Sequence, residues 1–155
     1  MAAKTTVHDT ERKEGAIVSY PVAASVAEIL KGAPVFVNAA WYAYSNDGTT
    51  TTITNGDMFV GIADDTVDNS SGANGDLDIA VRAQWIVVMP IAATAAQTDV
   101  GQNVYVNNTS DDAVVTLTSA TGAPQVTVGK IVEIVSTTKV RVALTGVYSV
   151  AANGA

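Results

Sequence analysis

One short pattern occurs twice in the chain, once in each half. Both copies have the form Gly-x-x-Val-aromatic-Val-Asn, at residues 32–38 and at residues 101–107. In each copy, a glycine suited to a turn precedes an aromatic residue that lies between two valines, which is the composition of a short β-strand. The pattern therefore predicts two similar strands, each entered through a turn.

Two further pieces of sequence repeat in the same order. Val-Gly-Ile at residues 60–62 corresponds to Val-Gly-Lys-Ile at residues 128–131, and Ala-Val-Arg-Ala at 80–83 corresponds to Lys-Val-Arg-Val at 139–142. In so valine-rich a chain the similarity could arise by chance, but the preserved order favours a duplication. Each half would then be a hairpin-bearing unit whose glycine relieves crowding where a strand bends.

The composition indicates the same fold class. The chain has 24 Val and 19 Thr but only four Leu, a balance that suits half-buried strands better than helix faces. We therefore expect an all-β fold, a compact β-barrel or β-sandwich of two pseudo-repeated hairpin units with an extended N-terminal arm. Only residues 22–30 and 92–97 have the pattern of short helices.

The chain divides into three parts. Residues 1–15 carry mixed charges and few apolar side chains, which predicts an arm; a frayed terminus is the alternative. Residues 16–148 form the predicted β domain, and residues 149–155 a C-terminal tail. The expected strands are residues 16–20, 35–38, 58–63, 77–89, 104–107, 114–118, 126–135 and 138–144.

The charge of the chain argues against several partners. The net charge is −7, and the five bases beyond residue 13 are scattered along the sequence. Nucleic acids and acidic membranes are therefore not expected partners. Because no cysteine is present, disulfides and thiolate metal sites are excluded. We expect a soluble protein made and kept in the cytoplasm, since the beginning of the chain lacks the apolar segment of a secretion signal.

An enzymatic function is not expected. His8 is the only histidine and lies in the arm, so a Ser-His-Asp or Cys-His arrangement has no base within the domain. Glu133, between Val132 and Ile134, is best explained as the solvent side of a strand. We expect neither catalysis nor a cofactor.

The acidic segment between residues 64 and 78 is the best ligand candidate. Its carboxylates are of the kind that calcium binds, but their spacing is not that of an EF-hand. We expect a solvated, metal-free loop, with a calcium site as the weaker alternative. The residues are Asp64, Asp65, Asp68, Asp76 and Asp78.

Aromatic side chains gather in one short segment. Trp41, Tyr42 and Tyr44 lie close together in the sequence, and Trp85 begins a second apolar run. Such residues are typical of a core or of a subunit interface, and these four are our interface candidates. A platform that stacks against sugars, built from Trp41, Tyr42 and Tyr44, is the alternative.

The order of the short motifs resembles the capsid decoration, or cement, proteins of tailed bacteriophages. The resemblance spans about residues 30–146. It rests on the order of several degenerate pieces, which are Lys-Gly-Ala-Pro-Val at 31–35, Phe-Val-Gly-Ile-Ala at 59–63, Ile-Ala-Val-Arg at 79–82, residues 92–97 leading into Val-Gly-Gln-Asn-Val-Tyr-Val at 100–106, Val-Gly-Lys-Ile-Val at 128–132 and Val-Arg-Val at 140–142. Two features depart from the family: a longer insertion with residues 41–44 and the threonine run, and a large side chain at Trp85.

This resemblance implies a non-catalytic structural virion protein, synthesised in the host cytoplasm and located on the outer surface of the capsid. Such proteins sit as homotrimers on an expanded head and bridge subunits of the major capsid protein. The arm supplies our capsid-contact candidates, which are Val7, His8, Thr10, Arg12 and Lys13. A carbohydrate-binding virion surface module and a tail-tube or fibre subunit are the alternatives.

Overall fold

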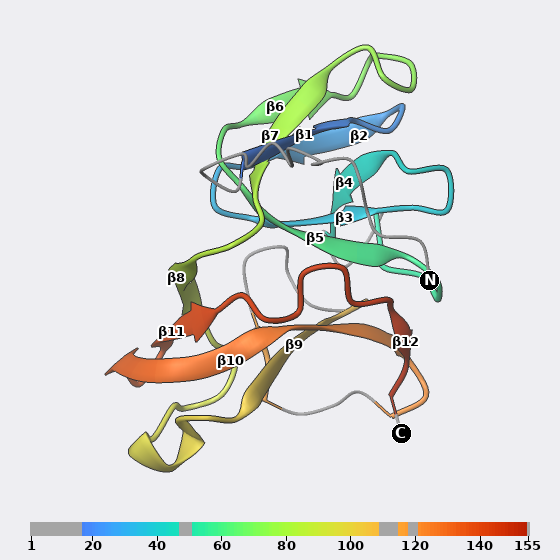
Figure 1. Ribbon diagram of the computed structural model, residues 1–155. Helices are drawn as coiled ribbons and strands as arrows, with labels where there is room; N and C mark the ends of the chain where they lie inside the picture. Colours follow the sequence, from blue (N-terminus) through green and yellow to red (C-terminus); the bar gives the residue numbers. More distant parts are fainter. Residues whose placement is uncertain (1–16, 47–50, 109–114, 118–120, 155) are drawn as a thin grey trace, which may run out of the picture.

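The computed structural model describes residues 17–46, 51–108, 115–117 and 121–154, and it is all-β (Figure 1). The first large sheet has the spatial order β1 (Ile17–Pro21), β7 (Asp78–Arg82), β5 (Met58–Ala63), β3 (Pro34–Val37) and β4 (Ala43–Ser45). The second has the order β12 (Ala152–Asn153), β10 (Pro124–Ser136), β11 (Lys139–Ala143) and β8 (Ile86–Pro90). Strand β9 (Asn103–Asn107) also pairs with β10, in antiparallel orientation. A small sheet pairs β2 (Val26–Ile29) with β6 (Val67–Asn69).

The two large sheets are built alike. In the first unit, which contains β1 to β7, four strands lie in the order β1-β7-β5-β3; in the second unit, which contains β8 to β12, the corresponding order is β8-β11-β10-β9. Both sheets also carry the same bulge. Val35 lies opposite Gly61 and the register then skips one residue, just as Val104 lies opposite Gly129 before the same skip. The predicted all-β fold of two pseudo-repeated units is therefore confirmed.

The turn glycines of the repeated motif also have matching geometry. Gly32 and Gly101 have φ values of +90° and +89°, a region that favours glycine. The N–H of Gly32 donates to the carbonyl of Ala63 at 2.9 Å, and that of Gly101 donates to the carbonyl of Ile131 at 2.8 Å. Each glycine thus begins its strand by the same hydrogen bond to the neighbouring strand.

The third repeated motif was aligned incorrectly. Arg82 lies opposite Ile62 on β5, and Ala143 lies opposite the equivalent Lys130 on β10. Ala143, rather than Arg141, is therefore the structural partner of Arg82. Arg141 and Ala143 are two positions apart, so they point to the same face of the strand. Matching Arg82 to Arg141 by residue identity therefore kept the inward and outward alternation and gave no sign of the error.

Valines form much of the core between the two units. Val35 and Val60 of the first unit and Val104 and Val128 of the second are fully buried in one continuous cluster. The units pack as a β-sandwich, and the described strands do not close into a barrel. Next to this cluster, the ring of Phe36 packs against the rings of Tyr44 and Phe59, with centroids 5.9 and 5.7 Å apart.

The C-terminal segment joins the two units. The N–H of Gly146 donates to the carbonyl of Val128 on β10, and the N–H of Tyr148 donates to the carbonyl of Phe59 on β5. The segment then returns to the second sheet, where β12 pairs with the beginning of β10. Residues 149–154, which were expected to form a tail, are thus hydrogen-bonded into the fold.

Both expected helices were wrong. Residues 22–30 contain the strand β2 instead, and Val22 forms a parallel bridge with Ala43. In residues 92–97 the only helical residue is Gln97, which begins the short 3₁₀ helix η1 (Gln97–Asp99). A segment this short gains more from pairing with a strand than from an isolated helical turn. The predicted arm, residues 1–15, lies outside the described residues.

Candidate interaction surface

Strand β8 presents apolar side chains to solvent at the edge of the second sheet. Ile86 and Val88 are 60% and 52% exposed, whereas Met89 is 2% exposed and faces the core. Among the described strands β8 pairs with β11 alone, and at its far end the N–H of Val115 donates to the carbonyl of Pro90. An edge strand with exposed isoleucine and valine is a typical place for contact with another chain.

Two bulges in β10 extend this surface. Ile131 lies opposite Val142 and Glu133 lies opposite Arg141, so Val132 is an extra residue between them; Val135 is extra in the same way further along the strand. A bulge breaks the inward and outward alternation. As a result Val132 and Val135 are 43% and 45% exposed.

Charged side chains lie among these apolar ones. Lys130 lies across from Ala143, which lies across from Ile86, and Arg141 lies across from Val88. Cross-strand partners share a face of a sheet, and Arg141 there pairs with Glu133. We name this surface the β8–β10 face; it comprises Ile86, Val88, Lys130, Val132, Glu133, Val135, Lys139 and Arg141.

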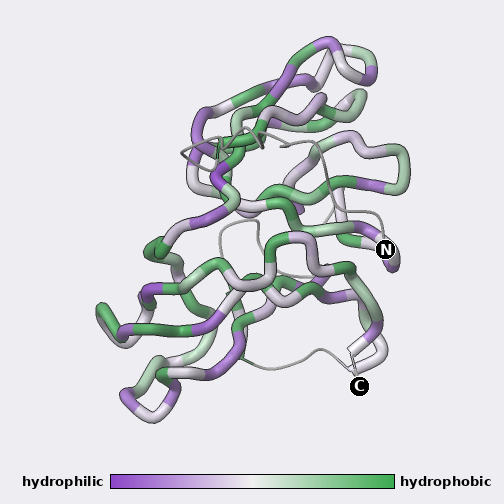
Figure 2. The backbone as a smooth tube through the Cα atoms, in the orientation of Figure 1, coloured by the Kyte–Doolittle hydropathy of each residue, from purple (hydrophilic) through white to green (hydrophobic). Residues whose placement is uncertain are grey.

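At two positions the equivalent surface of the first unit is polar where the β8–β10 face is apolar. The register of the sheets places Ser19 where the second unit has Val88, and Asp64 where it has Val132. Figure 2 shows hydrophobic colour at β8 and at the end of β10. Because the backbones match, the apolar character of the β8–β10 face comes from its side chains and is not required by the fold.

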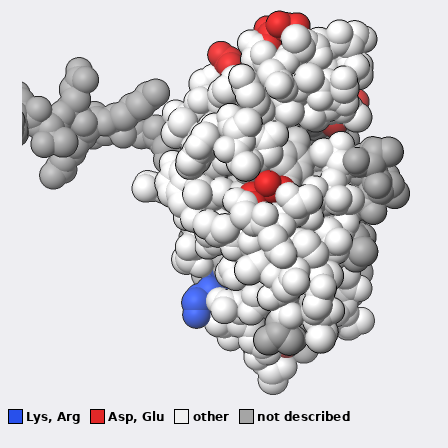
Figure 3. Space-filling model, turned by 90° about the vertical axis from the view of Figure 1, so that its right-hand side faces the viewer, with Lys and Arg blue, Asp and Glu red and all other residues white. Residues whose placement is uncertain are grey.

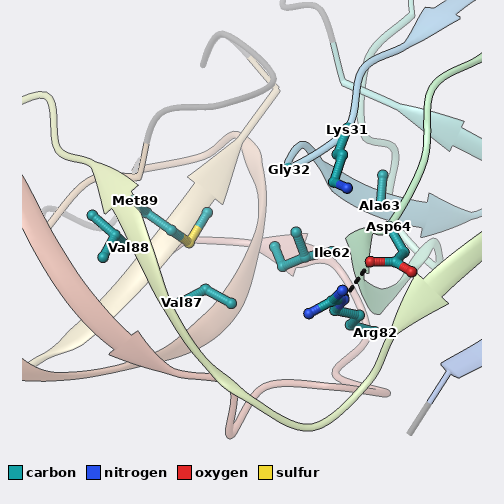
Figure 4. A pocket seen from close by; sticks show the side chains of 9 residues that line it. All are labelled: Lys31, Gly32, Ile62, Ala63, Asp64, Arg82, Val87, Val88 and Met89. Carbon is teal, nitrogen blue, oxygen red and sulfur yellow. Dashed lines mark hydrogen bonds and ion pairs between the residues drawn. The ribbon is translucent and has the colours of Figure 1, made fainter.

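A cleft of about 210 Å³ lies between the two units (Figure 4). Ile62 and Val87 point toward each other across it, and Arg82 forms an ion pair with Asp64 at its rim. The guanidinium carbon of Arg82 also lies 5.3 Å from the centre of the Trp85 ring, which is a cation–π contact. This arrangement neutralises the charge of Arg82 and holds Trp85, which is 51% exposed, directly before β8.

The predicted aromatic cluster is divided in the structure. Trp41 is 59% exposed in the turn between β3 and β4, where Asn38 accepts hydrogen bonds from the N–H groups of Ala40 and Tyr42. Tyr42 is half-buried. Tyr44, in contrast, is 4% exposed, so it belongs to the core and was wrongly chosen as an interface residue.

Tyr44 belongs to a buried polar cluster. Its hydroxyl donates to the carboxylate of Asp57 at 2.5 Å, and the same oxygen of Asp57 accepts from the N–H and the hydroxyl of Thr54, both at 2.8 Å. Burial, followed by the hydrogen bond to Asp57, raises the pKa of Tyr44 far above its ordinary value of 10.0, as expected for a desolvated phenol. Tyr44 and Asp57 also line a hollow of about 380 Å³ beside Thr51, Thr52 and Thr54.

The acidic residues of the first unit act separately. Asp64 pairs with Arg82, Asp65 accepts from the N–H of Ala80, and Asp76 accepts from the N–H of Ala73. Hydrogen bonds from the side chain and the backbone of Ser70 lower the pKa of Asp68. Asp78 is exposed. Within the described ranges, no three histidine, cysteine or acidic side chains are placed to hold a metal ion.

The capsid-contact candidates Val7, His8, Thr10, Arg12 and Lys13 lie outside the described residues. Ile86, Val88, Val132 and Val135 were not among the interface residues predicted from the sequence. The alternation in β8 could have shown that Ile86 and Val88 share one face, but no sequence signal marks the two bulges of β10.

Comparisons of the chain with protein-family models, with curated proteins and with solved structures gave no match. No described segment forms a helix of the length and apolarity needed to cross a bilayer.

Proposed function

We propose that this chain is a structural, non-catalytic virion protein that decorates the head of a tailed bacteriophage and stabilises it by bridging subunits of the major capsid protein. The structural observation that carries the proposal is the β8–β10 face, an exposed surface of apolar and charged side chains on a sandwich of two sheets. The ordered resemblance of residues 30–146 to capsid decoration proteins gives the surface this context.

Such a function requires many copies of the protein, each with a large area in contact with its neighbours, and it requires no reactive group. A stable protein interface buries about 800 Å² on each partner, so a small domain needs a large share of its surface for contacts. The β8–β10 face would provide contacts between copies in a homotrimer, and residues 1–15 would add contacts to the capsid. Val7, Arg12 and Lys13 are the arm residues whose side chains best suit such a contact.

Binding to heads tests the proposal. Purified protein is mixed with expanded heads of the same virus that lack it, and bound protein is measured by co-sedimentation and by the resistance of the heads to heat. We expect saturable binding and a higher disruption temperature. A variant that lacks residues 2–14 should bind less while melting at the same temperature as the full chain. Absence of saturable binding by the full chain would refute the function.

One observation favours a second function, carbohydrate binding. Trp41 is the more exposed of the two tryptophans and its turn is held by Asn38, as a sugar-stacking ring would need to be. Glycan-array binding that is lost in Trp41→Ala but kept in Trp85→Ala would support this function over decoration. Because Tyr44 is buried, such a platform would contain Trp41 and Tyr42 only.

A further inference from the structure

The two units differ in charge. The first unit, residues 17–83, contains eight acidic and two basic side chains, whereas the second unit, residues 84–154, contains four acidic and three basic ones. The face in Figure 3 shows this separation, with red side chains in the upper half and a blue one lower down. Most of the net negative charge of the two units therefore belongs to the first one.

All three described bases of the second unit lie on the β8–β10 face. Lys130, Lys139 and Arg141 are exposed there, and Glu133 is the one described acid among them. If two copies joined through the same face, these cations would be brought against one another. Like charges opposed across an interface cost binding free energy, so the face is poorly suited to a symmetric dimer.

The first unit offers a surface of the opposite sign. Asp65, Asp68, Asp76 and Asp78 are exposed on the segment that contains β6 and leads into β7, and Leu77 is 44% exposed between two of them. We name this the acidic surface. It combines negative charge with an apolar side chain, which complements the mixed basic and apolar character of the β8–β10 face.

We infer that copies of this chain associate head to tail, the β8–β10 face of one copy docking against the acidic surface of the next. A contact between two different surfaces leaves each partner with one free surface, so further copies add until a ring closes. The inference rests on the proposed function, for which it names the contacts within the homotrimer.

Charge reversal and restoration tests the inference. Sedimentation equilibrium of the wild type at low ionic strength should show association that weakens at high ionic strength, because salt screens exposed charges. Lys130→Glu with Lys139→Glu should raise the dissociation constant by about tenfold or more, and so should Asp65→Lys with Asp78→Lys. All four substitutions in one chain should restore association, because the surfaces are again opposite in sign.

The restoration distinguishes the two geometries. A symmetric dimer through the β8–β10 face would be indifferent to Asp65 and Asp78, so an unaltered dissociation constant in Asp65→Lys with Asp78→Lys would overturn the inference. A wild type that stays monomeric at every concentration would do the same. Circular dichroism melts of each variant show whether a lost association reflects unfolding.

A second pair of variants tests whether the apolar side chains of the β8–β10 face contribute to the contact. Val88→Ser gives the second unit the residue that the first unit has at Ser19, so the fold tolerates it, and it should weaken association. Trp41→Asn is the matched control because it removes a larger exposed side chain at a positive φ of 65°, a conformation that asparagine accepts. Equal effects of the two variants would contradict the inference.

Head binding separates this inference from the proposed function. Wild type that binds heads but does not self-associate leaves the function intact and overturns the inference. Wild type that associates in the charge-dependent way but does not bind heads overturns the function and leaves the head-to-tail contact supported.

Discussion

Gly61 and Gly129 are structural equivalents that leave the same space for a carbonyl group. A Cβ atom at Gly61 would lie 2.2 Å from the carbonyl oxygen of Arg82, and one at Gly129 would lie 2.0 Å from that of Ala143. Both distances are far below any normal contact, and the neighbour in each case is backbone of the adjacent strand. The two units thus share a steric requirement together with a strand order.

Gly129→Ala should destabilise the protein by about 3 kcal/mol, since β10 and β11 must separate to admit a methyl group. Gly61→Ala should cost at least as much, because Gly61 also has a φ of +137°, where a side chain is strained. Gly101→Asn is the control: its φ is positive, but no atom of the described residues lies within 4 Å of the added Cβ. Urea denaturation gives the free energy of unfolding of all three variants. If Gly129→Ala lowered it no more than Gly101→Asn does, the steric explanation would be contradicted.

Ile131 and Val132 are neighbours in the sequence with opposite environments. Ile131 is 1% exposed, so Ile131→Ala should lower the free energy of unfolding by about 2–5 kcal/mol. Val132 is the extra residue of a bulge and is exposed. Val132→Ala should therefore change the free energy of unfolding by at most about 0.5 kcal/mol, as surface substitutions do. The two free energies of unfolding are measured by denaturation. Comparable decreases in Ile131→Ala and Val132→Ala would mean that Val132 is not the extra residue of the bulge.

The Tyr44 hydroxyl should make stability fall at high pH. The pKa of Tyr44 is raised in the folded chain above the ordinary value of 10.0 that it has when unfolded. Above the unfolded pKa, unfolding therefore releases a proton. The free energy of unfolding should then decrease by about 1.4 kcal/mol per pH unit for this residue, while the stabilisation is fully present below the unfolded pKa. In Tyr44→Phe the decrease should be smaller by this amount, and parallel curves for the two proteins would refute it.

Trp85 should report on association. The chain has two tryptophans, so Trp41→Asn leaves Trp85 as the single tryptophan, directly before Ile86. When ionic strength is lowered and copies associate, its emission should shift to shorter wavelength and acrylamide should quench it less. Trp85→Phe leaves Trp41, at the turn between β3 and β4, whose emission should not change. A shift in both variants would indicate a different contact surface.

Much of the fold could be predicted from local sequence, because alternation and turn glycines are local properties. The motifs at residues 32–38 and 101–107 predicted β3 and β9 and the turns before them. The same reasoning was wrong for β2, because Val26–Ile29 is a strand only through its pairing with β6, and β3 to β5 lie between the two in the sequence. Non-local pairing of this kind leaves no trace in a short window of sequence.

The surface was predicted less well than the fold. Trp85 was selected for its size and is exposed, but Tyr44 was selected for the same reason and is buried with Asp57. Size and aromaticity do not distinguish a core from an interface, whereas a buried hydrogen-bond partner does. Val132 was assigned by alternation with Ile134, and the bulge that overrides the alternation became visible only from the register of β10 and β11.

The segment that completes the first unit lies far from β5 in the sequence, after all the strands of the second unit except β12. Phe59 on β5 is hydrogen-bonded through its backbone to Tyr148 and Ser149, and the N–H of Gly56 donates to Ala151. A chain emerging from the ribosome therefore cannot finish the first unit until residues 148–151 have been synthesised. Pairings of such sequence separation slow folding and raise contact order. The two halves share an architecture, yet they must reach it as one cooperative folding unit.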